Sequence, residues 1–135
     1  MAALLGFAVG WEREFRGREA GERTFALVSL GAASFMALGS RFFPADAGKV
    51  MEGIAVGIGF LGTGLIFRTE GRGLIGLTTA AAVWAMAAVG TLVGGGELVL
   101  GVLVTVLLLV VLEFEHVPLA RRFDPEHKPG RREPE

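Results

Sequence analysis

The sequence contains no cysteine in its 135 residues, and this absence excludes several kinds of protein at once. A disulfide framework, a thiolate metal site and a cysteine nucleophile are all ruled out. Charged residues are scarce, at 20%, where soluble domains have roughly 25%. Their formal net charge of −1 argues against a nucleic-acid partner, which needs a basic surface. The excess lies in apolar residues, at 52%, and in glycine, with 21 residues.

The apolar residues gather in five runs that contain no charge. These runs cover residues 1–11, 24–40, 53–67, 73–96 and 98–112. A helix that crosses the hydrocarbon core of a bilayer needs about 20 apolar residues, with a lower limit of about 17. The second and fourth runs reach that limit alone, and the third and fifth reach it when flanking Lys and Glu side chains extend to the headgroups. The sequence therefore predicts an all-α, multi-pass transmembrane helical bundle.

A soluble helical bundle is the structural alternative. Its helices would show a charged outer face, but the runs 73–96 and 98–112 contain nothing more polar than threonine. In lipid, such segments satisfy their backbone hydrogen bonds only as helices. We predict helices at about residues 1–11, 24–43, 50–67, 74–93 and 97–114. They form a membrane domain over residues 1–115, and we expect 116–135 to be a short, disordered cytoplasmic tail.

The first run is too short to cross a membrane. No basic residue precedes it, so it does not fit the pattern of a signal peptide. We expect a truncated first helix, from a start site placed too late or from a fragment that lacks about ten upstream residues.

Lysine and arginine are unevenly divided between the two sides of such a bundle. One side receives four arginines from residues 13–23, two from residues 68–72 and five basic residues from the tail. The other side receives only Arg41 and Lys49. Because cytoplasmic loops are enriched in Lys and Arg, we place the tail and the two arginine-bearing loops in the cytoplasm.

Glycine-rich segment 57–62, GIGFLG, matches the G-x-G-x-x-G pattern of dinucleotide-binding proteins. That motif requires a preceding strand and an acidic residue about 20 positions later, and neither is expected here. Small residues four apart instead allow close helix packing, and two such stripes run through this segment, one through Gly53 and Gly57 and one through Ala55, Gly59 and Thr63. We therefore predict that helix 50–67 lies at the centre of the bundle. The predicted packing residues are Gly53, Gly57, Gly59, Gly62 and Gly64.

Segment 12–24 carries four glutamates and four arginines. One interpretation is a solvated loop whose exposed ion pairs contribute about 0–1 kcal/mol each. The other is that Glu12, at the membrane edge, pairs with a nearby arginine and closes one mouth of the bundle. Thr78 and Thr79 have a similar pair of interpretations, hydroxyls bonded to their own helix or hydroxyls that face an aqueous vestibule. The candidate functional or gating residues are Glu12, Arg13, Arg16, Arg23, Thr78 and Thr79.

Glu52 is an acid near the end of a predicted spanning helix. It is either a functional acid or the partner of Lys49 in an interfacial ion pair. The spans contain no acidic cluster suited to Mg²⁺, so we predict no metal site, no cofactor and no catalytic residue.

The sequence resembles the MgtC/SapB family of bacterial inner-membrane proteins in three stretches. These are GWEREFRGREAGERTFALVSLGAA at 10–33, GIGFLGTGLIFR at 57–68 and GLTTAAAVWAMAAVG at 76–90. The resemblance covers the membrane core of the family, without the cytoplasmic domain of its longer members. It places the family's glutamate and arginines on Glu12, Arg13, Arg16 and Arg23, its glycines on Gly57, Gly59, Gly62 and Gly64, and its threonines on Thr78 and Thr79.

The resemblance implies a non-enzymatic protein of the bacterial inner membrane, tied to magnesium limitation and acid stress through modulation of the rotary ATP synthase. The expected partners are the lipid bilayer, a second copy of the chain and a membrane complex such as that synthase. The competing hypothesis is a transporter or channel for Mg²⁺ or protons, lined by the charged loop and by Thr78 and Thr79. A membrane enzyme is disfavoured because the sequence offers no nucleophile with a base and no metal cluster.

Overall fold

The computed structural model describes residues 1–18, 20–69 and 73–113, and within these residues it contains five α-helices. They are α1 (Ala2–Phe15), α2 (Glu22–Phe42), α3 (Ala47–Gly64), α4 (Leu77–Gly94) and α5 (Leu98–Glu113). A short 3₁₀ helix, η1 (Pro44–Asp46), joins α2 to α3. The prediction of an all-α helical bundle is confirmed. Among the described helices, α2 and α4 are long and apolar enough to cross a membrane.

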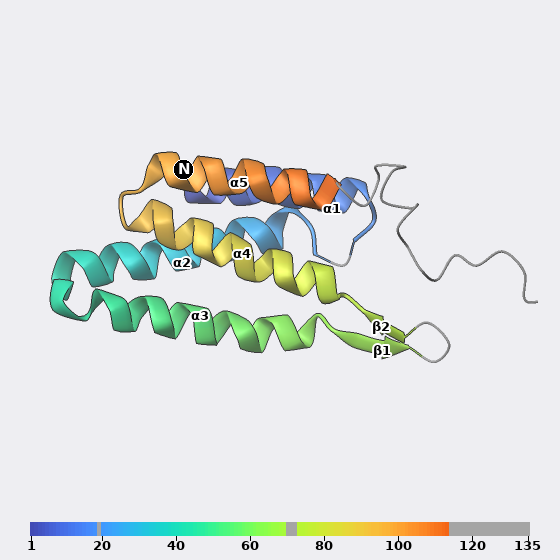
Figure 1. Ribbon diagram of the computed structural model, residues 1–135, viewed down its shortest axis with the longest axis horizontal. Helices are drawn as coiled ribbons and strands as arrows, with labels where there is room; N and C mark the ends of the chain where they lie inside the picture. Colours follow the sequence, from blue (N-terminus) through green and yellow to red (C-terminus); the bar gives the residue numbers. More distant parts are fainter. Residues whose placement is uncertain (19, 70–72, 114–135) are drawn as a thin grey trace, which may run out of the picture.

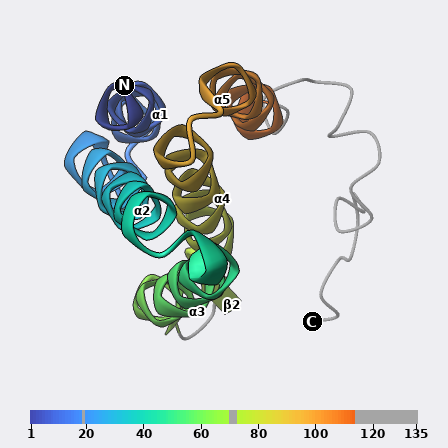
Figure 2. The ribbon, with the colours of Figure 1, turned by 90° about the vertical axis from the view of Figure 1, so that its left-hand side faces the viewer.

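Helices α2 and α4 occupy the middle of the bundle (Figures 1 and 2). Helix α1 packs mainly on α2, α5 packs mainly on α4, and α3 lies below the two central helices in the view of Figure 2. One end of the bundle holds the end of α1, the start of α2 and the end of α5, and we call it the basic end. The opposite end holds η1 and the α4–α5 turn, and we call it the η1 end. Segments that the sequence assigned to one side of a membrane therefore share one end of the bundle.

Buried side chains meet where α1, α2 and α4 come together. Val9 of α1, Phe25 of α2 and Met86 of α4 have no exposed surface, and Val83 and Val89 of α4 extend the same cluster. Bulky apolar groups thus fill the space between the two central helices and α1.

Glycine allows the helices of this core to approach closely. A Cβ at Gly6 of α1 would collide with the backbone carbonyl of Phe25, and one at Gly90 of α4 with the carbonyl of Ser29. Gly10 and Gly94 stand in equally tight contacts with α2. Close backbone approach through small residues is the usual mode of helix association in membranes, so the glycine excess does serve helix packing, on α1 and α4.

The prediction that helix 50–67 lies at the bundle centre is wrong. No residue of α3 is buried. A Cβ added at Gly53, Gly57, Gly59 or Gly64 would meet no heavy atom of the described chain within 4 Å, and one at Gly62 would meet only the Cβ of Ala80, at 3.8 Å. Between these glycines α3 carries exposed bulky residues such as Val56 and Phe60. Small residues permit close packing but do not create it, and no helix of the described chain packs against Gly53, Gly57, Gly59 or Gly64.

Helix boundaries differ from the predictions at several places, and α3 covers Ala47–Gly64 rather than 50–67. Helix α1 continues through the charged residues to Phe15 rather than ending near residue 11. Between α3 and α4 the chain forms two short antiparallel strands, β1 (Phe67–Thr69) and β2 (Gly73–Ile75), with Phe67 opposite Ile75. Gly76 directly precedes α4 and has a φ of 87°. This left-handed conformation favours glycine. The predicted tail, 116–135, lies outside the described residues.

Candidate functional site at the basic end

Arg13 is the most unusual residue of the bundle because it is a buried cation. It lies in the last turn of α1 and is 1% exposed. Its Nη2 donates a hydrogen bond to Oγ1 of Thr79, in the first turn of α4, at 3.5 Å. A buried charge requires hydrogen-bonding partners, so this contact helps to fix the end of α1 against the start of α4.

The threonine hydroxyls of the bundle fall into two groups. The hydroxyls of Thr63, Thr91 and Thr105 donate to carbonyls one turn earlier in their own helices, at 2.7, 2.9 and 2.7 Å. Such self-bonding is the ordinary behaviour of threonine in apolar helices. Thr79 differs because its hydroxyl accepts a hydrogen bond from another helix.

Arg16 joins a second set of charges at the same end of the bundle. Its Nε lies 2.5 Å from Oε1 of Glu12, one turn earlier in α1, and its Nη2 pairs with Oε1 of Glu113, the last residue of α5. The Glu12 side chain is 15% exposed and that of Arg16 is 23% exposed, so the pair is largely shielded from solvent. This arrangement fastens the end of α5 to the end of α1.

The predicted site residues are only partly brought together. The structure places Glu12, Arg13, Arg16 and Thr79 in the two contacts above. Thr78 is exposed, although it adjoins Thr79. Arg23 is also exposed, in the first turn of α2, and no ion pair of the described chain includes it.

The interpretation of segment 12–24 as a solvated loop is wrong for its first residues. Residues 12–15 belong to α1, and Glu12 pairs with Arg16 as the alternative interpretation expected. Sequence reasoning missed Glu113 as a site residue. Glu113 could have been found, since it is the first charge after the run 98–112 and that run ends on the same side as segment 12–24.

Charges at the η1 end form a separate and more exposed group. Lys49 pairs with Asp46 at 2.7 Å, and both side chains are at least half exposed. The expected alternative, a Lys49–Glu52 pair, is therefore replaced by Lys49–Asp46. Within the described residues, no group of three or more His, Cys, Asp or Glu side chains could hold a metal ion.

The sequence model of the MgtC family matches residues 1–118. A relative from Escherichia coli strain K12, "Putative magnesium transporter YhiD", is 36% identical over 125 residues, which cover 86% of this chain and 58% of the relative. "Protein MgtC" of Brucella abortus is 46% identical over 112 residues, 82% of this chain and 46% of the relative. "Protein MgtC" of Salmonella typhimurium strain LT2 is 44% identical over 108 residues, 80% of this chain and 46% of the relative.

The chain thus spans about half the length of the curated relatives that it matches. No solved structure matches it.

Proposed function

Because the chain belongs to the MgtC family of membrane proteins, we propose that it is a non-enzymatic regulator of adaptation to magnesium limitation or acid stress. It acts by contact with a membrane complex such as the rotary ATP synthase and carries no ion. Its location is the bacterial inner membrane, and the basic end faces the cytoplasm. The uneven division of lysine and arginine supports this orientation.

Burial of Arg13 is the observation that favours a regulator over an ion carrier. A guanidinium that is 1% exposed holds a positive charge between α1 and α4. A divalent cation that moved through this end of the bundle would meet that charge in surroundings of low dielectric constant, where repulsion is strong. The apolar core, with Val9 of α1 and Met86 of α4, lies further along the same helices. Both features favour a closed bundle over an ion pathway.

Transport of Mg²⁺ or protons is the second candidate function. The printed name of the Escherichia coli relative favours it, and so do the carboxylates of Glu12 and Glu113 at the basic end. In a transporter, these carboxylates and Arg16 would exchange partners as the mouth opens.

Flux measurements in liposomes separate the two functions. We expect vesicles with the purified chain to take up Mg²⁺ and protons no faster than empty vesicles. Uptake that is abolished by both Glu12→Gln and Arg23→Gln would establish transport and overturn the regulator. In inverted membrane vesicles, we expect the chain to change the rate of ATP synthesis. The change should be lost with Arg13→Gln and retained with Arg41→Gln, an exposed arginine at the η1 end.

Orientation can be tested because the chain has no native cysteine. We expect Ala45→Cys, in exposed η1, to react with a membrane-impermeant maleimide added to intact spheroplasts. A reporter enzyme that works only in the cytoplasm should be active when it is fused after Arg122. A periplasmic reporter would refute the orientation.

A further inference from the structure

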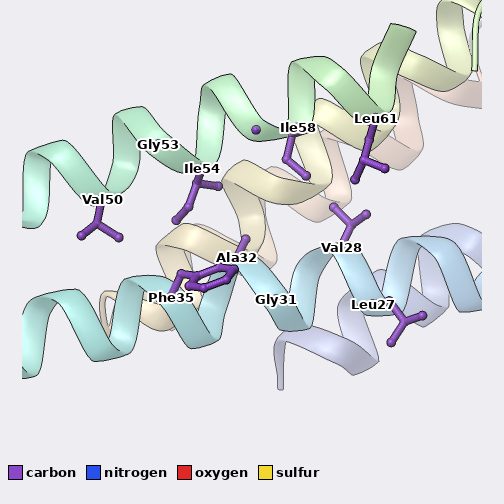
Figure 3. A pocket seen from close by; sticks show the side chains of 11 residues that line it. Leu27, Val28, Gly31, Ala32, Phe35, Val50, Gly53, Ile54, Ile58 and Leu61 are labelled. Carbon is purple, nitrogen blue, oxygen red and sulfur yellow. The ribbon is translucent and has the colours of Figure 1, made fainter. Parts of the chain in front are cut away.

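An apolar groove runs between α2 and α3, outside the cluster at the basic end (Figure 3). Its volume is about 570 Å³, and its walls are aliphatic and aromatic side chains with three glycines. Leu27 and Phe35 lie on the α2 wall, and Val50, Gly57 and Leu61 on the α3 wall. The groove therefore offers a continuous hydrocarbon surface that no part of the described chain fills.

The groove is about as long as one acyl chain in a bilayer. Its α3 wall extends from Val50 to Leu61, which is about 16 Å at a rise of 1.5 Å per residue. The hydrocarbon core of a bilayer is about 30 Å thick. One acyl chain fills about half of that thickness, which is close to the length of the α3 wall.

The groove is closed at the η1 end. Val50 packs on Gly39 of α2 there, and a Cβ added at Gly39 would lie 2.7 Å from Cγ2 of Val50. Towards the basic end α2 and α3 separate (Figure 1). Since Val50 lies three residues after the start of α3, this closure is near the η1 end of the bundle. An acyl chain can end at this closure.

Arg23 provides a positive charge at the open end of the groove. It lies four residues before Leu27, so the two side chains are neighbours on one side of α2. It is exposed and belongs to no ion pair of the described chain. Arginine binds phosphate, as it binds carboxylate, through paired N–H donors. The apolar groove and the charge at its mouth thus match the two parts of a phospholipid.

We propose that this groove binds a phospholipid of the leaflet at the basic end. One acyl chain lies between α2 and α3, and the headgroup phosphate contacts Arg23. The headgroup phosphate thus gives Arg23 an ionic partner, and no ion pair within the described chain includes Arg23.

Native mass spectrometry of the purified full chain in detergent tests this site. Phosphatidylglycerol is the probe, and diacylglycerol with the same acyl chains is the phosphate-free comparison. We expect one saturable phosphatidylglycerol, with binding at least tenfold tighter than that of diacylglycerol. Arg23→Gln should raise the Kd about tenfold, as expected for the loss of one charged hydrogen bond. Arg41→Gln, at the opposite end of α2, should leave the Kd unchanged.

Two glycines of α3 provide a matched pair of variants. Gly57 lines the groove and Gly59 does not, and both have open space around them in the described chain. Gly57→Leu should abolish the saturable binding, whereas Gly59→Leu should preserve it. Equal effects of Gly57→Leu and Gly59→Leu would overturn the proposal. Equal effects of Arg23→Gln and Arg41→Gln would overturn it as well. Light scattering that shows a wild-type dimer and a Gly57→Leu monomer would assign the groove to a second copy and would also overturn it.

Discussion

Helices α3 and α4 are both 18 residues long and both rich in small residues, but they have opposite environments. Eight residues of α4 are buried, against α2 and its other neighbours, while none is buried in α3. The glycines of α4 meet backbone atoms of α2, whereas Gly57 and Gly59 of α3 face open space. Spacing of small residues therefore indicates which face of a helix can be approached, and the match with a partner's surface decides which face is used.

Replacement of a glycine should produce the largest difference between α3 and α4 in the free energy of unfolding. Gly90→Leu would push a side chain into the backbone of α2 at Ser29, and we expect it to lower the free energy of unfolding by about 3 kcal/mol or more. Gly57→Leu enters open space and should change it by less than about 0.5 kcal/mol. Thermal unfolding in detergent, followed by the fluorescence of Trp11 and Trp84, measures both. A well-folded Gly90→Leu variant would contradict the central place of α4.

Truncation of a large side chain should produce a smaller difference between the two helices in the free energy of unfolding. Met86 of α4 has no exposed surface, and Phe60 of α3 is 82% exposed. Met86→Ala leaves a cavity and should cost about 2–3 kcal/mol, while Phe60→Ala should cost less than about 0.5 kcal/mol. The same unfolding measurement applies to both variants. If Phe60→Ala costs as much as Met86→Ala, α3 is covered by another surface in the purified protein.

The smallest of these differences concerns threonine hydroxyls. Thr79 of α4 accepts a hydrogen bond from buried Arg13, and Thr63 of α3 donates only to its own helix among the described residues. Thr79→Val removes an acceptor from a buried cation and should cost about 1–2 kcal/mol. Thr63→Val should be neutral within about 0.5 kcal/mol. Thermal unfolding and the ATP-synthesis assay should both change with Thr79→Val and stay unchanged with Thr63→Val. Equal changes for the two variants would contradict a special role of the contact between Arg13 and Thr79.

The bundle itself could be predicted because lipid leaves an apolar segment few choices. Runs such as 73–96 have no polar face, so helices were the sole way to satisfy their backbone. The place of each helix could not be predicted in the same way. Both α3 and α4 are apolar and rich in small residues, and these features do not say which of them packs on α2 along its length.

The site was predicted in part for a related reason. Glu12, Arg13 and Arg16 stood out as charges at a membrane edge, but their spacing does not say which of them is buried. Arg13 turns inward because α1 continues past residue 11, which brings position 13 onto the face that already carries buried Val9 and Gly6. The pairing of Arg16 with Glu113 joins positions 97 residues apart, and local sequence contains no information on such a contact.

The contact between Arg13 and Thr79 also sets an order of events during synthesis. The two residues are 66 positions apart, and at about 5–20 residues per second a ribosome needs about 3–13 s to make the intervening chain. Helices α1 and α2 can pair through Gly6 and Gly10 before α4 exists. Throughout that interval the hydrogen bond between Arg13 and Thr79 cannot form. The end of α1 is therefore fixed against α4 late in synthesis, and the Arg16–Glu113 pair follows only when α5 is complete.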